Sequence, residues 1–491
     1  MNRRVFQLFV VFVVLFAALL INLNYVQVVQ SEKLANDPRN ARKLYEGYAK
    51  ERGPIVTADG AVLARSVESN DQLIWRREYP QGELFAHITG YLSFSHGMTG
   101  LERTYQDVLL GTDPEVALRP ENIVDYLARG PRGATVEVAI TERAQRAAAS
   151  ALGGRAGAIV AMDPRTGAIL AMYANPTFDP NPIASHDPAV SDPAYDTAIS
   201  PSRGKPAVSQ AFQERVAPGS TFKVVTAATA LMNGLGPGTA YPDPAFLDLP
   251  DTNATLANFT RGRPCVDGRQ TTMEQALPVS CNTYFAQLGL SLGSERMRNE
   301  AELFGFNKPF PELGLENAPS VFPPQQAFAG NKPAVAFAAI GQYDVAATPL
   351  QMAAVAAAVG NQGQLKQPHV VSKIKDAKGR VVRDNERNGG TELSRPMDQP
   401  RANQLRDMMV EAVEKGTGRS ARIPGVKVAG KTGTTNNFEQ AWFMAFAPAE
   451  NPTVAVAVLI QNDGNEATGG QVAAPAGKQV MQVILGQQSG N

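Results

Sequence analysis

Residues 157–173 read GAIVAMDPRTGAILAMY, and this stretch decides how the largest part of the chain is expected to fold. Two apolar runs, 157–163 and 167–173, flank a short turn that begins at Pro164. Strands in which nearly every residue is apolar are typical of a sheet that is covered on both faces. The stretch therefore predicts a buried β-hairpin.

Three more short strands are predicted near the other end of the chain. They cover 426–434, 441–447 and 453–460, and a helix around 471–485 follows them. Strands at both ends of a long segment, with helices between them, predict one discontinuous domain. Its sheet would be antiparallel and five-stranded, assembled from the hairpin and the late strands, with helices on both faces. We therefore expect a multidomain α+β protein in which this domain occupies residues 141–491.

The segments around these strands carry less regular patterns. Helices are predicted at 221–233, 273–292 and 346–359. Residues 175–208 hold seven prolines and many Asp and Ser residues, so we expect an extended excursion there. Residues 30–140 mix short strand-like runs with turn signals, which predicts a small, irregular α+β domain before the larger one.

Residues 1–29 predict a membrane anchor. Two arginines precede an apolar run over residues 5–23, which contains only two strongly polar side chains. As a helix this run would be roughly 28 Å long at ~1.5 Å per residue, close to the hydrocarbon thickness of a bilayer. No small-residue cleavage site follows it, which favours an uncleaved signal anchor over a removable signal peptide. We expect a cytoplasmic stub, one transmembrane helix and an extracytoplasmic remainder at the plasma membrane.

Charge and metal-ligand counts argue against two classes of function. Lys plus Arg and Asp plus Glu number 46 each, so the 491-residue chain has a formal net charge of zero. This balance gives no electrostatic support for a nucleic-acid partner. The four histidines are scattered, and two cysteines are too few for a zinc ribbon or an iron–sulfur site. We therefore expect no metal, no cofactor and no nucleic acid.

Three short motifs carry the candidate chemistry: Ser220-Thr-Phe-Lys223, Ser280-Cys-Asn282 and Lys431-Thr-Gly-Thr434. Ser-x-x-Lys alone is weak evidence, because it also occurs at Ser202–Lys205 between prolines and at Ser372–Lys375 in a strand-like run. Only the first motif follows a Pro-Gly turn and opens a helix, where positions i and i+3 share a face. The Lys223 amine is therefore expected to reach the Ser220 hydroxyl.

These residue types suit nucleophilic catalysis by a serine. A serine hydroxyl is a poor nucleophile until a nearby base takes its proton. With histidine scarce, Lys223 is the available base, provided that burial or a neighbouring cation lowers its pKa. Lys431 is a candidate for that cation, with the Ser280 hydroxyl bridging the two amines. A helix that begins at Ser220 would also aim backbone N–H groups at a developing oxyanion.

The three motifs, in this order, resemble the signature of penicillin-binding proteins and serine β-lactamases. Here Ser-Cys-Asn stands where many β-lactamases have Ser-Asp-Asn. The resemblance extends to Arg52-Gly-Pro-Ile55 and Gly100-Leu-Glu102, which are similar to motifs in the non-catalytic domain of class B penicillin-binding proteins. Gly341-Gln342 and Thr348-Pro-Leu-Gln351 are similar to a helical region of their transpeptidase domain. This resemblance implies a monofunctional peptidoglycan D,D-transpeptidase.

The resemblance also implies roles for the catalytic residues. Ser220 would attack the penultimate D-Ala of a stem peptide, and Lys223 would be the general base. Ser280 and Lys431 would relay the proton to the departing amine. β-Lactams would mimic the substrate and acylate Ser220. A polytopic lipid-II polymerase is the partner that the resemblance implies.

Further residues are implied to bind the substrate. Asn282 would hydrogen-bond the peptide, and the backbone N–H groups of Ser220 and Thr434 would form the oxyanion hole. Thr432 and Thr434 would hold the substrate's carboxylate. Gly433 would keep the strand edge open for the substrate backbone.

Two alternatives remain open on the sequence. A secreted β-lactamase needs a group that activates water, and in class A enzymes this group is a glutamate. Glu295 is a faint match to that glutamate, although the anchor and the smaller domain argue against a β-lactamase. A membrane-anchored scaffold or β-lactam sensor would leave the three motifs unused, and the short inner tail cannot hold a signalling part. A bifunctional synthase is disfavoured because too few residues separate the anchor from the hairpin for a glycosyltransferase domain.

Cys265 and Cys281 lie on the expected oxidising side of the membrane, 16 positions apart. One interpretation is a disulfide that closes the loop between them, worth about 3 kcal/mol on the chain-entropy model. The other interpretation is two buried thiols. The sequence leaves both open.

Overall fold

The computed structural model describes residues 3–30, 48–117, 132–259, 262–435, 438–462 and 466–488. Two compact units are distinguished within the chain. One contains residues up to 51 together with 67–76, and the second contains the rest. The candidate site lies wholly in the second unit.

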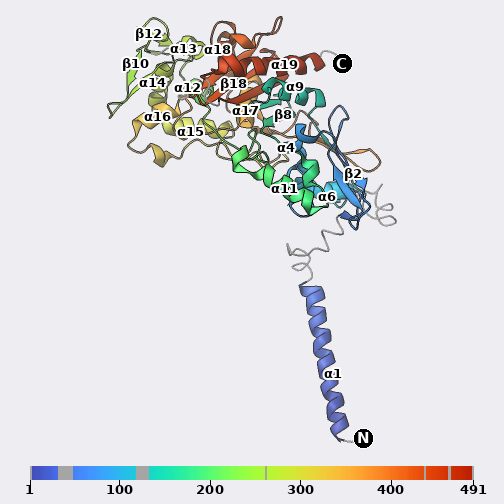
Figure 1. Cartoon of the computed structure of the whole chain (residues 1–491). Helices are drawn as coiled ribbons and strands as arrows, with labels where there is room; N and C mark the ends of the chain where they lie inside the picture. The colour runs from blue at the N-terminus through green and yellow to red at the C-terminus, as the bar shows by residue number, and fades with distance from the viewer. Residues whose placement is uncertain are drawn as a thin grey trace. The chain divides into compact units, whose positions relative to one another are not determined.

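The first helix matches the predicted anchor. Helix α1 (Arg3–Asn24; Figure 1) is continued by a π-helical turn, η1 (Tyr25–Val29), and no residue of α1 is buried. Within the described ranges, Arg3–Val28 is the one helical stretch long and apolar enough to cross a membrane. At ~1.5 Å per residue its 26 residues exceed the ~30 Å hydrocarbon core of a bilayer. The predicted N-terminal apolar helix is confirmed.

A six-stranded sheet has the order β15-β14-β6-β1-β2-β3. Its strands are β1 (Ile55–Val56), β2 (Val62–Glu68), β3 (Trp75–Glu78), β6 (Thr135–Val138), β14 (Val371–Lys375) and β15 (Val381–Asp384). Strand β1 is parallel to β6 and antiparallel to β2, while β14 is antiparallel to both β6 and β15. The β14–β15 hairpin thus joins strands of the smaller domain, although it comes from the middle of the range predicted for the larger one.

The two motifs of the smaller domain meet in a buried ion-pair cluster. Arg52 Nε donates to Glu102 Oε2 at 3.1 Å, and Arg77 Nε donates to Glu102 Oε1 at 2.6 Å. The Glu102 side chain is fully buried. Burial alone would raise the pKa of Glu102, but the charges of Arg77 and Arg52 outweigh it and hold the pKa below its usual value. This cluster joins three distant segments of the smaller domain.

A five-stranded sheet forms the centre of the larger domain, in the order β17-β18-β19-β7-β8. Its strands are β7 (Gly157–Met162), β8 (Ile169–Asn175), β17 (Ala429–Thr434), β18 (Gln440–Ala447) and β19 (Val454–Gln461). Every neighbouring pair is antiparallel. The predicted sheet, including the early hairpin and the three late strands, is confirmed.

Helices cover both faces of this sheet, as its apolar strands predict. On one face α9 (Glu142–Leu152) and α19 (Ala474–Gln488) share a buried cluster with Ile159 and Ala161. On the other face, α17 (Pro349–Gly360) packs against the residues of β7 that alternate with Ile159 and Ala161. Figure 1 shows α9 and α19 beside one another at the sheet. Successive side chains of a strand point to opposite faces, which explains the continuous apolar run.

Other helices and hairpins surround the sheet. The helices of the site region are α12 (Lys223–Met232), α13 (Met273–Val279), α14 (Asn282–Leu292), α15 (Ser294–Leu303), α16 (Lys332–Ala338) and α18 (Gln399–Glu414). Short two-stranded pairs are β9 (Ala240–Pro242) with β12 (Gln270–Thr272), β10 (Phe246–Asp248) with β11 (Thr255–Ala257), β13 (Leu365–Lys366) with β16 (Glu392–Ser394), and β4 (Leu92–Ser93) with β5 (Gly97–Met98). Short helices of the smaller domain are α4 (Ala86–Thr89), α5 (Gly100–Thr104), α6 (Gln106–Leu110) and α7 (Pro114–Ala117).

The expected extended excursion at 175–208 is wrong. This segment contains α10 (Pro180–Ile183) and α11 (Pro188–Ile199). In each helix an aspartate, Asp179 or Asp187, accepts a backbone N–H as N-cap, and a proline occupies the first helical position. Proline is tolerated there because its missing N–H would have no helical partner. Pro180 and Pro188 therefore begin helices in this segment, while Pro193 lies inside α11.

The region 273–292 is helical as predicted, but it forms two helices, α13 and α14, with a break at Ser280 and Cys281. Pro278 lies in the last turn of α13, and Ser280 adopts the left-handed conformation with φ 63°. A proline cannot donate to the preceding turn, and a left-handed residue ends a helix. The third predicted helix begins at Pro349 instead of residue 346, with Thr348 as its N-cap.

Candidate active site

The Ser220 segment is held in place by hydrogen bonds to Gly341 and to Trp442 of β18. Residues Gly219–Phe222 form a 3₁₀ turn, η4, that leads into α12. Gly219 N–H donates to the Gly341 carbonyl at 3.0 Å, and a Cβ on Gly341 would lie 2.1 Å from the Gly219 oxygen. Trp442 Nε1 donates to the Ala217 carbonyl at 3.0 Å. These contacts fix the backbone that presents Ser220, which is half-buried.

Lys223 is completely buried and its amine points at the second motif. Its Nζ donates to Ser280 O at 2.7 Å and to Asn282 Oδ1 at 2.6 Å, and Ser280 Oγ lies 3.4 Å away. A neutral amine has two N–H donors and one lone pair. The two carbonyl-type oxygens can occupy both donors, which leaves the lone pair to accept a hydroxyl proton.

Ser280 stands between the two lysines. Lys431 Nζ donates to Ser280 Oγ at 2.7 Å and to the Thr432 carbonyl at 2.8 Å. The left-handed backbone of Ser280 lets its carbonyl and its hydroxyl both approach Lys223. The hydroxyl is therefore placed to pass a proton between the two amines.

Burial lowers the pKa of both amines. The Lys223 side chain is fully buried, and desolvation followed by the charge of Lys431 holds its pKa well below the usual value. Desolvation lowers the pKa of Lys431 to about 7. Removing an ammonium group from water disfavours its charged form, and a second cation nearby disfavours it further. Both effects favour the uncharged form of Lys223, which is the form that a general base needs.

Strand β17 presents the third motif with its two faces in different surroundings. A Cβ on Gly433 would lie 2.9 Å from Pro218 O and 3.0 Å from Thr221 Cγ2. Gly433 therefore lets the Ser220 segment approach the strand. Thr434 Oγ1 accepts the Gly469 N–H at 3.2 Å on the side opposite to Lys431.

The threonines of the motif differ in accessibility. Thr432 is buried, and its hydroxyl is 2.5 Å from that of Thr417, a residue that no motif includes. Thr434 is half-buried, so it is the more accessible residue of the two. No local pattern identifies Thr417 as a neighbour of the motif.

The structure thus brings Lys223, Ser280, Asn282 and Lys431 into one hydrogen-bonded cluster. In the part of the chain that the structure describes, the hydrogen bonds of Lys223 go to Ser280 and Asn282 and none goes to the Ser220 hydroxyl. Glu295, the faint β-lactamase match, lies exposed on α15.

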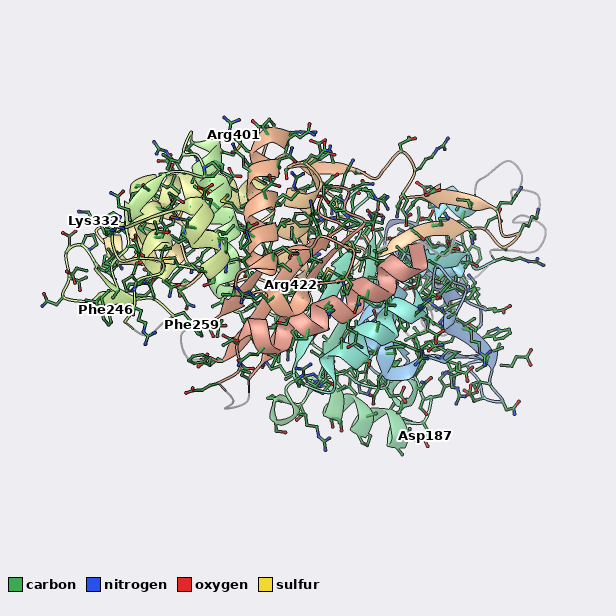
Figure 2. All side chains as sticks on the ribbon, turned by 90° about the horizontal axis from the view of Figure 1, so that it is seen from above. Asp187, Phe246, Phe259, Lys332, Arg401 and Arg422 are labelled. Atoms are coloured by element: carbon green, nitrogen blue, oxygen red, sulfur yellow. A yellow bond between two sulfur atoms is a disulfide. The ribbon has the colours of Figure 1, made fainter. Side chains whose placement is uncertain are left out.

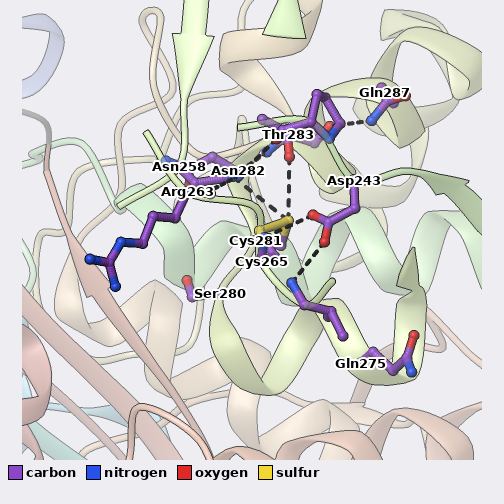
Figure 3. The surroundings of a disulfide bond; sticks show 12 residues. Asp243, Asn258, Arg263, Cys265, Gln275, Ser280, Cys281, Asn282, Thr283 and Gln287 are labelled. Carbon is purple, nitrogen blue, oxygen red and sulfur yellow. Dashed lines mark hydrogen bonds between the residues drawn. A yellow bond between two sulfur atoms is a disulfide. The ribbon is translucent and has the colours of Figure 1, made fainter. Parts of the chain in front are cut away.

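A disulfide joins Cys265 to Cys281, with a Cα–Cα distance of 5.6 Å (Figure 3). Asp243 lies beside it, fully buried, and accepts backbone N–H groups from Cys265 at 2.8 Å and Val266 at 2.7 Å. These three side chains are close enough to hold a metal ion. Both sulfurs are in the disulfide and backbone donors occupy the carboxylate, so the group does not suit a metal.

The fold and the cluster define a serine acyl-transfer enzyme of the penicillin-recognising type. A family model described as penicillin binding protein transpeptidase domain matches residues 157–482. A second, described as penicillin binding protein A dimerisation domain, matches residues 52–136. The chain belongs to the penicillin-binding protein transpeptidase family.

The relatives within that family are peptidoglycan D,D-transpeptidases and penicillin-binding proteins. Peptidoglycan D,D-transpeptidase PbpA of Mycolicibacterium smegmatis is 38% identical, over 99% of this chain and 99% of the relative. PbpA of Mycobacterium tuberculosis is 36% identical over the same shares. The solved ceftriaxone acyl-enzyme complex of M. tuberculosis penicillin-binding protein A has a TM-score of 0.82 and 35% identity, and covers 90% of this chain and 100% of that chain. Penicillin-binding protein 2 of Pseudomonas aeruginosa has a TM-score of 0.74 and 31% identity, over 89% of this chain and 96% of that one.

Proposed function

We propose that this protein is a peptidoglycan D,D-transpeptidase that cross-links stem peptides through an acyl-serine at Ser220, in cell-wall synthesis during growth and division. The observation that carries this function is the buried cluster of two lysines with depressed pKa values around Ser280, next to a serine presented at the start of a helix. Full-length similarity to D,D-transpeptidases supports the choice of substrate.

In the first half-reaction Ser220 Oγ attacks the carbonyl carbon of the penultimate D-Ala. Lys223 takes the hydroxyl proton as the C–O bond forms. Ser280 and Lys431 pass a proton to the departing nitrogen, the C–N bond breaks and D-Ala leaves. The backbone N–H groups of Ser220 and Thr434 stabilise the oxyanion, because preorganised donors act where charge develops.

In the second half-reaction an amine of a neighbouring stem peptide attacks the acyl-serine. A new amide forms, the bond to Ser220 breaks and the hydroxyl recovers a proton from the attacking amine through Lys223. Asn282 hydrogen-bonds the peptide, Thr432 and Thr434 hold the carboxylate, and Gly433 gives the substrate room at the strand edge. β-Lactams enter the same first step and remain on Ser220.

The location and organisation follow from the same proposal. Residues 1–29 are a cytoplasmic stub and signal anchor, 30–140 the non-catalytic domain and 141–491 the transpeptidase domain outside the plasma membrane. A polytopic lipid-II polymerase that supplies glycan strands is the partner. The apolar helix Arg3–Val28 supports the anchor.

Intact-mass spectrometry of the full chain in detergent, mixed with benzylpenicillin, tests the function. Wild-type protein is expected to gain the mass of one drug and keep it, and Ser220→Ala is expected to gain none. Ser202→Ala is the matched control, because Ser202 belongs to another Ser-x-x-Lys segment. Rapid loss of drug with little adduct would indicate a β-lactamase instead. Cross-linking is then measured as the amide product formed from a pentapeptide and an acceptor amine, while release of D-Ala measures the acylation step.

A further inference from the structure

Asn258 is a buried residue that none of the motifs includes. It follows β11 and is 4% exposed. Its Nδ2 donates to Pro244 O at 3.1 Å and to Arg263 O at 3.2 Å, and its Oδ1 accepts from Thr283 N at 3.0 Å (Figure 3). Both donors and one acceptor site of the carboxamide are therefore used within the protein. The amide ties three separate segments together.

One of these bonds caps the helix that carries Asn282. The first N–H groups of a helix have no partner within it and need an outside acceptor, usually the side chain of the N-cap residue. In α14 the N-cap is Cys281, and its side chain makes no capping hydrogen bond. Its sulfur lies 3.7 Å from Asn258 Oδ1 but carries no proton, because it is in the disulfide. Asn258 thus supplies from another strand the cap that Cys281 does not.

The neighbouring residue holds Asn282 itself. The Ala257 carbonyl accepts Asn282 Nδ2 at 3.0 Å, while Asn282 Oδ1 accepts Lys223 Nζ at 2.6 Å. These two bonds fix which end of the Asn282 amide faces the lysine. Residues 257 and 258 therefore hold the first two residues of α14, directly after the turn that contains Ser280.

We propose that Asn258 is a positioning residue for acyl transfer: its carboxamide fixes the turn 280–283 so that Ser280 O and Asn282 Oδ1 face the Lys223 amine. The proposal rests on the proposed function of the same site. Asn258 acts through Lys223, because the two acceptors decide where the amine's lone pair points. Loosening the turn therefore slows the acylation step and leaves the initial binding of a β-lactam nearly unchanged.

The test measures the acylation of the full chain by benzylpenicillin at a series of drug concentrations, which separates the binding constant K from the rate constant k2. Asn258→Ala removes the cap, and k2 is expected to fall about 10- to 100-fold while K changes less than about threefold. Asn258→Asp keeps an acceptor for Thr283 N–H. Its second carboxylate oxygen, however, has no proton to donate to the carbonyls of Pro244 and Arg263 and repels them. This variant is expected to lose thermal stability and yet keep k2 within about fivefold, since Asp caps a helix as well as Asn.

Asn317 provides the matched control. Its side chain makes the same kinds of bond, from Nδ2 to Phe310 O and Leu315 O and from Phe310 N to Oδ1, in a loop that contains no site residue. Asn317→Ala is expected to lose stability with k2 unchanged. An unchanged k2 in Asn258→Ala, or an equal fall in Asn317→Ala, overturns the proposal. If Asn258→Ala does not fold, a tenfold fall of k2 in Asn258→Asp overturns it. A wild type that is not acylated refutes the proposed function instead.

Discussion

Lys431 Nζ and Ser280 Oγ are 2.7 Å apart, although 151 positions separate the two residues in the chain. The lysine comes from the edge of the central sheet and the serine from a break between two helices. Ser280 is also the neighbour of Lys223, so one hydroxyl connects the two amines. This connection makes the protonation of the two lysines interdependent.

The first prediction concerns the pH dependence of acylation by benzylpenicillin. A general base acts in its unprotonated form, so the rate is expected to rise with pH through the pKa of Lys223, which burial and the charge of Lys431 hold well below its usual value. The proton on Lys431 is lost around pH 7, and the rate is expected to fall above it. Stopped-flow acylation between pH 4.5 and about 9 would give a bell-shaped profile whose apparent pKa values belong to the pair.

Lys431→Arg is the informative variant for this profile. Arginine keeps its charge throughout the range, so the falling limb is expected to disappear while the rising limb remains. A wild-type rate that climbs steadily to about pH 10, as for a lysine of ordinary pKa, would contradict the prediction.

The second prediction concerns Gly433. In Gly433→Ala the new Cβ would meet Pro218 O at 2.9 Å and Thr221 Cγ2 at 3.0 Å, so the Ser220 segment must move. We expect acylation to slow about 100-fold, with a stability loss of about 1–3 kcal/mol. Gly236→Ala is the control, because a Cβ there meets nothing within 4 Å. Equal rates in the two variants would show that the close approach is not needed.

The third prediction concerns the buried carboxylate of the smaller domain. Glu102→Gln leaves Arg52 and Arg77 without a counter-charge in a buried site, and we expect a loss of about 3–5 kcal/mol in the free energy of unfolding. Glu316→Gln, which breaks an exposed pair with Arg103, is expected to cost under about 1 kcal/mol. Thermal unfolding of both variants measures the difference, and similar midpoints would refute the role of the cluster.

The fourth prediction concerns the Cys265–Cys281 disulfide. Mass spectrometry after alkylation under non-reducing conditions is expected to find no alkylated cysteine, and two adducts would rule the bridge out. The double variant Cys265→Ala/Cys281→Ala is expected to lose about 3 kcal/mol of stability, because the open loop is less constrained in the unfolded state. Chemical denaturation of oxidised wild type and double variant provides the comparison.

The sheet could be predicted because its strands carry an unusual signal. The two strands on either side of the turn in 157–173 are apolar at almost every position, and the late strands repeat this pattern. Such strands have to be buried on both faces, so their architecture follows from composition alone. The order of the three motifs then indicated, through the family resemblance, that Ser220, Ser280 and Lys431 belong to one site.

The local geometry of the second motif could not be predicted in the same way. The run from 273 to 292 has an apolar helical pattern, and a left-handed serine costs energy that only the surrounding contacts can repay. The site compensates Ser280 with the hydrogen bonds to Lys223 and Lys431. Pro278 is a local sign that a helix ends here, but the left-handed backbone of Ser280 is set by distant partners and has no such sign in the sequence.

Two further features of the structure were missed in the sequence, and only one of them could have been predicted. The helices after Asp179 and Asp187 could have been found, since Asp followed by Pro is a recognised start of a helix. Asn258 could not, because its partners lie on three separate segments and nothing around it has a regular pattern. Side-chain caps supplied from another strand become visible only in three dimensions.

The split sheet has a consequence for the timing of folding. Strand β19 pairs directly with β7, so the hairpin 157–175 cannot complete its sheet until residues 454–461 have been made. At roughly 5–20 residues per second, the roughly 280 residues between them take roughly 15–60 s to synthesise. During that interval Ser220 exists without Lys431 beside it. A chain that is still emerging from the ribosome or crossing the membrane therefore cannot form an acyl-enzyme. Ser220 can be acylated only when nearly the whole length of the chain has been delivered.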